Sequence, residues 1–156
     1  MASLRTLLEN LDASAIDSIR ELTFDGQTFL GRVVDVIDGD TVVAVMRAFG
    51  DTMHRFSIRV ADIDVIEMRG DDLTKSKSVR EMALRFLMNE DDSATTNVRD
   101  RPAIRRDLIA SPIFVSVRCR HFDKYGRVLA EILRERDGRS LGDFLLESNL
   151  AVVYKK

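Results

Sequence analysis

The segment from Thr28 to Ile63 constrains the fold most strongly, because it is rich in β-branched and apolar residues and is broken by two turn signals. One signal is Asp38-Gly39 and the other lies at residues 49–51. An Asp-Gly pair between apolar runs favours a tight hairpin, and β-branched residues favour strands. The segment is therefore predicted to form a three-stranded meander.

A second group of strands is predicted nearer the C-terminus. Every second residue from Ile113 to Cys119 is apolar or cysteine, and residues 127–134 supply a partner after a turn at residues 123–126. With the meander, this makes five short strands. Five strands in this order predict a small, closed Greek-key barrel of the OB type, whose open face commonly binds oligonucleotides or oligosaccharides.

Helical patterns flank and interrupt these strands. Leucines and isoleucines recur at helical spacing over residues 4–22, which predicts two short amphipathic helices. An apolar stripe over residues 79–87, with Ser78 and Glu81 arranged as a capping box, predicts a helix near 79–89.

The predicted fold class is α+β: a five-stranded barrel with a helix between strands 3 and 4, a short C-terminal helix starting near Ser140 and an N-terminal helical extension. The chain of 156 residues fits one barrel domain, 27–156, preceded by an extension, 1–26, that packs on the barrel or on a partner. Residues 90–110 are polar and rich in arginine and are predicted to form a long loop, as a binding flap or a disordered insertion.

The charge balance excludes a strongly basic domain, because 24 basic and 26 acidic residues give a net charge of −2. Any basic surface must therefore be local. Residues 99–127 hold eight basic and three acidic residues, and this region is a candidate for following a phosphate backbone. Besides Lys124 and Arg127, its basic residues are Arg99, Arg101, Arg105, Arg106, Arg118 and Arg120.

The sequence predicts a soluble and preferably intracellular protein with no membrane contact. A single cysteine, Cys119, excludes an intrachain disulfide. The first twenty residues lack the apolar run of a signal peptide, and charged residues interrupt every stretch that approaches the length of a membrane span.

Carboxylates and arginines predict a phosphodiesterase site. Asp40 follows a tight turn and Asp64 ends a strand, so both are expected at one rim of the barrel as oxygen ligands for a hard cation, which these ligands alone do not identify as Ca²⁺ or Mg²⁺. Arg59 and Arg127 are expected to flank a phosphate, since guanidinium groups match its geometry. Glu67 is then expected to orient or deprotonate a water molecule.

Four segments together resemble one family: residues 37–41, Arg59 with Asp64 and Glu67, residues 123–127, and residues 149–154. In this order and spacing they resemble the staphylococcal nuclease-like, or thermonuclease, family. The resemblance implies Ca²⁺-dependent hydrolysis of DNA and RNA with little sequence preference, single strands being favoured and 3′-phosphate ends being left. It favours Ca²⁺ over Mg²⁺ or another divalent cation.

The resemblance also implies roles for individual residues. Asp40 and Asp64 match metal-binding carboxylates, Thr41 matches the residue whose main-chain carbonyl binds Ca²⁺, and Asp38 matches an accessory acidic position. The remaining matches are to catalytic and phosphate-binding positions: Glu67 is the general base, Arg59 and Arg127 are the phosphate clamps, and Lys124 and Tyr125 contact a neighbouring phosphate. One departure is Ile66, which stands where the family usually has proline.

Three alternatives remain open. The first is that the chain is a non-catalytic OB-type module that binds nucleic acid or a protein. The second concerns Tyr154, which either stacks on a base or packs on the barrel. The third concerns the N-terminal helices, which either cover the barrel or form a dimer contact, a monomer being slightly favoured over a homodimer.

Overall fold

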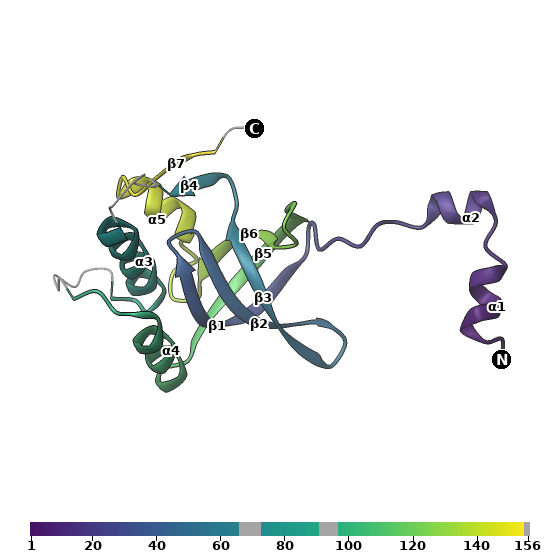
Figure 1. The fold of residues 1–156 in the computed structure, drawn as a ribbon, viewed down its shortest axis with the longest axis horizontal. Helices are drawn as coiled ribbons and strands as arrows, with labels where there is room; N and C mark the ends of the chain where they lie inside the picture. The colour runs from purple at the N-terminus through teal and green to yellow at the C-terminus, as the bar shows by residue number, and fades with distance from the viewer. Residues whose placement is uncertain (66–72, 91–96, 155–156) are drawn as a thin grey trace.

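Five strands close into a barrel in the computed structural model, which describes residues 1–65, 73–90 and 97–154. The strand order around the barrel is β1-β2-β3-β6-β5, and β5 pairs back onto β1 (Figure 1). The bounds of the strands are β1 (Thr28–Asp38), β2 (Thr41–Phe49), β3 (Thr52–Val60), β5 (Ile113–Phe122) and β6 (Val128–Arg134). The predicted meander and the predicted later strand pair are both confirmed.

The barrel is mixed, because β3 and β6 run parallel while the other neighbouring pairs are antiparallel. A separate two-stranded sheet joins β4 (Ile63–Val65) to β7 (Ala151–Val153), with Asp64 opposite Val152. The sequence gave no sign of this pairing. It anchors the segment that follows β3 to the C-terminal end of the chain.

The barrel core consists of apolar side chains on alternate positions of the strands. Val33, Ile58, Val117 and Ile132 have no exposed surface, as expected for the inner face of a small closed barrel. Cys119 is also buried there, and burial raises the pKa of its thiol to about 11.

An aromatic cluster closes one end of the barrel. Phe24, which precedes β1, is buried, and its ring centroid lies 5.2 Å from that of Phe122 and 5.4 Å from that of Phe29. Rings at these separations pack favourably beyond the area they bury. Phe24 therefore fixes the point at which the N-terminal extension joins the barrel.

Helices α3 (Leu73–Leu87) and α4 (Arg101–Ala110) pack against β1 on the same side of the barrel (Figure 1). The prediction of a structureless loop over 90–110 is wrong for residues 101–110. Asp100 caps α4 by accepting a hydrogen bond from the backbone N–H of Ala103, and Ile104 and Leu108 bury one face of the helix. Capping and burial of two apolar residues one turn apart outweigh the polar composition.

Helix α3 begins earlier than predicted. Its first residue is Leu73, so Ser78 lies inside the helix and its hydroxyl donates to the carbonyl of Thr74. Glu81 is buried in ion pairs and does not serve a capping box. The predicted start at residue 79 is therefore wrong.

Helix α5 (Leu141–Glu147) follows β6 and packs against α3 and β6. Ser140 caps it by accepting a hydrogen bond from the backbone N–H of Asp143, and Asn149 ends it with a positive φ of 59°. Both features confirm the predicted C-terminal helix. The rings of Phe86 and Phe144 stack with their centroids 4.7 Å apart and join α3 to α5.

The two N-terminal helices, α1 (Leu4–Glu9) and α2 (Ala13–Ser18), stand clear of the barrel at the end of an extended segment (Figure 1). Ser3 and Asp12 cap them, and neither helix has a buried residue. The two predicted helices are present, and in this structure they do not cover the barrel. Among the described helices, none has both the length and the apolar character needed to cross a membrane.

Candidate functional site

The turn between β1 and β2, which carries Asp40, packs against α3 at Gly39. A Cβ atom at Gly39 would lie 2.5 Å from Cγ1 of Val79, so only glycine lets the turn approach the helix this closely. The carbonyl of Asp40 accepts a hydrogen bond from the backbone N–H of Val60 at 2.8 Å. The backbone of Asp40 is thereby joined to the end of β3.

Arg59 brings two of the predicted site carboxylates together. Its Nη2 atom lies 2.6 Å from Oδ1 of Asp64 and 3.2 Å from Oδ2 of Asp40. The side chains of Arg59 and Asp40 are 14% and 16% exposed, whereas that of Asp64 is 47% exposed. Two carboxylates thus share one guanidinium, and the cluster carries one excess negative charge.

The backbone near the end of β3 holds the Arg59 guanidinium in place. Arg59 donates from Nη1 to the carbonyl of Val60 at 2.7 Å and from Nη2 to the carbonyl of Ile63 at 2.8 Å. Charge-assisted hydrogen bonds of this kind are short and directional. The guanidinium is therefore oriented by its own loop as well as by the two aspartates.

The donor set suits a hard cation. Asp40 and Asp64 provide carboxylate oxygens that converge on a single positive group, which is the chemistry that Ca²⁺ and Mg²⁺ favour. Thr41 is buried beside them, and its hydroxyl donates to Oδ1 of Asp40 at 3.2 Å. Asp38 is exposed at the end of β1.

Among the residues that the structure describes, no third acidic ligand completes this pair. Within residues 1–65, 73–90 and 97–154, no group of three histidine, cysteine or acidic side chains is placed to hold a metal ion. Ile66 and Glu67, the latter predicted to be the general base, lie outside the described residues.

A tight turn between β5 and β6 orients Arg127. The Asp123 carboxylate accepts hydrogen bonds from the backbone N–H groups of Tyr125 and Arg127 and, at 2.7 Å, from Nε of Arg127. Burial tends to raise the pKa of Asp123, but these hydrogen bonds outweigh burial and hold the pKa below its ordinary value. Asp123 therefore stays ionised and fixes the guanidinium at the turn.

A pocket of about 390 Å³ joins the two arginines, since both Arg59 and Arg127 line it. Lys124 and Tyr125 line the same pocket, and Tyr125 is 71% exposed. Nζ of Lys124 lies 5.1 Å from the centroid of that ring, and Cζ of Arg127 lies 5.5 Å from it. Basic groups and an open aromatic face thus meet in one pocket.

Tyr154 also lines this pocket and is half-exposed. Its backbone N–H donates to the carbonyl of Asp62, which continues the β4–β7 pairing by one residue. Both alternatives for Tyr154, stacking on a base and packing on the barrel, stay predictions. The pairing of β4 with β7, which local sequence does not reveal, brings the tyrosine to the pocket.

The two predicted nucleic-acid contacts on β5 form ion pairs on the barrel surface. Arg118 and Arg120 both contact Glu131, and Arg120 also contacts Asp62. Arg120 lines the pocket beside Lys124. Arg120 is therefore brought to the predicted site, whereas Arg118 lines a separate pocket.

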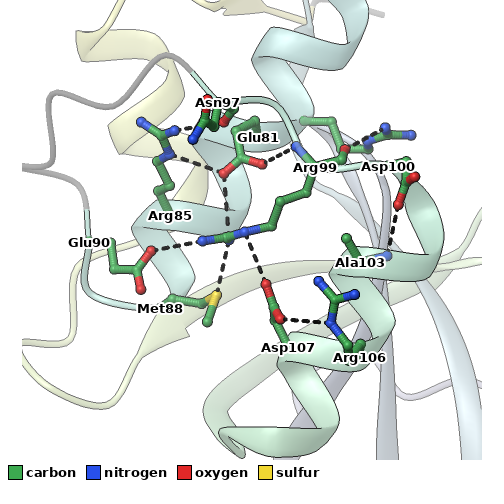
Figure 2. A network of polar contacts seen from close by, with 11 residues as sticks. Glu81, Arg85, Met88, Glu90, Asn97, Arg99, Asp100, Ala103, Arg106 and Asp107 are labelled. Carbon is green, nitrogen blue, oxygen red and sulfur yellow. Dashed lines mark hydrogen bonds and ion pairs between the residues drawn. The ribbon is translucent and has the colours of Figure 1, made fainter.

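Arg99 belongs to an ion-pair network between α3 and α4 (Figure 2). Its guanidinium lies 3.5 Å from Glu81, 3.2 Å from Glu90 and 3.1 Å from Asp107. Glu81 is buried and also accepts a hydrogen bond from Nε of Arg85 at 3.0 Å. This network, which the sequence did not reveal, ties the residues before α4 to α3.

Two other arginines of the 90–110 region fasten α4 to the barrel. Arg101 and Arg105 donate to the buried carboxylate of Asp35 at 2.6 Å and 3.0 Å. Burial tends to raise the pKa of Asp35, but the two arginines outweigh burial and lower the pKa. Arg106 contacts only Asp107 among the described ion pairs and is mostly exposed. The contact of all these arginines with nucleic acid stays a prediction.

No protein-family model matches the chain, and a search of curated proteins finds no match.

Proposed function

We propose that this protein is a Ca²⁺-dependent nuclease that hydrolyses DNA and RNA with low sequence specificity. The observation that carries the proposal is the meeting of Arg59, itself bound to Asp40 and Asp64, with Arg127 in one pocket. The strand order with a parallel β3–β6 pair supports the finer proposal that the barrel is of the OB type.

Asp40 and Asp64 would hold the calcium ion through their carboxylates, and Thr41 would add its main-chain carbonyl. When bound, the ion would supply positive charge against the phosphate oxygens. Arg59 is the present counterion of both aspartates, so its guanidinium becomes available to a phosphate as the aspartates take another cation. Under this proposal, binding of the cation by the two aspartates releases the Arg59 guanidinium to bind a phosphate.

Arg59 and Arg127 would bind the phosphate that is cleaved. Negative charge accumulates on the non-bridging oxygens as water attacks, and two guanidinium groups held by fixed partners offset this charge without further ordering. The Glu67 carboxylate would accept a proton from the attacking water. The new bond joins the water oxygen to phosphorus, the bond from phosphorus to the 5′ oxygen breaks, and a proton passes to that oxygen, which leaves a 3′-phosphate.

The pocket favours single-stranded substrate. The open faces of Tyr125 and Tyr154 offer stacking surfaces for unpaired bases, which any base can use. Lys124 and the arginines would contact phosphates, and phosphate contacts carry no sequence information. Single-stranded DNA and RNA are therefore the proposed partners.

Cleavage of end-labelled single-stranded DNA tests the proposal. We expect cleavage with Ca²⁺, less with Mg²⁺ and none with chelator. Glu67→Ala, Arg59→Ala and Arg127→Ala should each lower turnover by about 100-fold or more, the scale expected for loss of a general base or of transition-state charge stabilisation. The matched control is Arg136→Ala, at an exposed arginine that lines none of the described pockets, and it should cleave normally.

Near-normal turnover in all three site variants would refute the assignment. If the protein does not cleave DNA but still binds it in a binding assay, the nuclease proposal gives way to the alternative of a non-catalytic OB-type binding module. Circular dichroism of each variant separates loss of chemistry from loss of fold.

A further inference from the structure

A groove of about 920 Å³ runs along the outer face of β1 and β2 and reaches the end of α4. Four of its lining residues are apolar and exposed: Leu30, Met53, Ile109 and Phe114. Leu30, for example, is 63% exposed to solvent. Contiguous apolar surface of this kind is typical of an interaction site. The groove shares no lining residue with the candidate nuclease pocket.

The N-terminal extension carries a matching apolar stripe. Leu4, Leu7 and Leu8 lie on one face of α1 at helical spacing, and all three are more than half exposed. Ile16 on α2 is exposed to a similar degree. A helix this short does not persist in water by propensity alone, so its apolar face calls for a packing partner.

The charges of the two surfaces are complementary. Residues 1–26 contain two basic and five acidic residues. The groove is lined by Arg32 and Arg47 and by no acidic residue, and all of its lining residues are described. Nε of Arg32 is buried without a hydrogen-bond partner in the described part of the chain, while Nη2 of the same side chain donates to the carbonyl of Ile109 at 3.3 Å. Arg47 is already paired with Asp51, so the positive charge of the groove comes from Arg32. Within the leucine-bearing helix α1, Arg5 and Glu9 pair with each other, so the acidic excess of the extension lies outside α1.

We propose that the groove of one chain binds the α1–α2 segment of a second copy, which in turn binds the segment of the first. The extension is anchored at Phe24 and leads away from its own barrel (Figure 1), so its stripe is free to reach another molecule. Exchange of the same segment in both directions makes a closed two-fold dimer and buries both stripes and both grooves. The proposal does not rest on the nuclease activity.

Sedimentation velocity of the full chain over a range of concentrations tests the exchange. We expect the unsubstituted chain to form a dimer. Leu8→Glu in the stripe and Leu30→Glu in the groove should each raise the dimer dissociation constant about tenfold or more, because each places a carboxylate in the apolar contact. Val98→Glu is the matched control: Val98 is 44% exposed and lies in neither surface, so the dimer should persist.

Mixing the two monomeric variants separates this exchange from other dimers. The Leu8→Glu chain keeps an intact groove and the Leu30→Glu chain keeps an intact stripe, so the mixture should form a mixed dimer through one intact contact. A monomeric unsubstituted chain would overturn the proposal, whether its own helices fold back or stay free. A dimer that survives both substitutions would also overturn it. Both substituted residues are mostly exposed, and thermal denaturation checks that the barrel is intact.

Discussion

Gly39 occupies the point where the β1–β2 turn meets α3, and its missing side chain lets the turn that carries Asp40 lie against the helix. Val79, against which the turn packs, is buried and β-branched, so it has little freedom to move aside. The contact between Gly39 and Val79 therefore positions the turn that carries Asp40, although neither residue has a reactive group.

Gly39→Ala should lower the free energy of unfolding by about 1–3 kcal/mol, because the added methyl group overpacks the contact with Val79. Val79→Ala should restore part of this loss when combined with Gly39→Ala, which urea denaturation of both single variants and the double variant measures. Strictly additive effects of the two substitutions would contradict the proposed contact.

Single residues were predictable where the signal is local. Asp38-Gly39 forms the expected turn, and Ser140 caps the expected helix. Glu81 was not predictable, because the spacing of Ser78 and Glu81 is the same in a capping box and inside a helix. The partner that distinguishes the two cases is Arg99, 18 residues away.

At the scale of elements, α4 depends on Asp35. This buried carboxylate on β1 accepts hydrogen bonds from two arginines of the helix, and Arg32 of β1 adds hydrogen bonds to the carbonyls of Leu108 and Ile109. Helix α4 was not predicted because the composition of residues 90–110 is polar and basic, although Asp100 and Pro102 form a recognisable helix start. The β4–β7 pairing was not predicted for another reason, since pairing between residues nearly ninety positions apart leaves no local pattern in the sequence.

The stability that Asp35 contributes should depend on pH. Its pKa is lowered in the folded state, so its contribution is complete above the ordinary pKa of about 4 and is lost as the pH falls through the folded pKa. Asp35→Asn should therefore lower the free energy of unfolding by about 1–3 kcal/mol at neutral pH. The difference from the unsubstituted chain should narrow in acid.

Urea denaturation at pH 7 and in acid measures this dependence. Asp17→Asn, at an exposed residue of α2, is the control and should have little effect at either pH. A difference between Asp35→Asn and the unsubstituted chain that is constant with pH would contradict the role of the Asp35 charge.

The whole molecule divides into a barrel with its own core and an extension that buries none of its helical residues. The barrel follows from strand alternation and turn chemistry, which are local and therefore visible in sequence. The placement of α1 and α2 was not visible, because an apolar stripe shows that a partner is needed and does not show which surface provides it.

Deletion of residues 1–22 should leave the free energy of unfolding of the barrel within about 0.5 kcal/mol when it is measured at a concentration too low for association. Phe24→Ala, which removes a buried ring at the end of the extension, should instead cost about 3 kcal/mol. Equal losses from the two changes would show that the helices pack on their own barrel after all.

Burial of Cys119 offers a way to measure unfolding of the barrel in solution. This residue is the chain's single thiol, and it is enclosed in the barrel with its pKa raised to about 11. The thiolate is the reactive form, so the folded protein resists alkylation and the unfolded chain does not. The rate at which Cys119 is labelled therefore measures the rate at which the barrel opens. A second cysteine placed on the surface would accept a fluorophore without removal of Cys119.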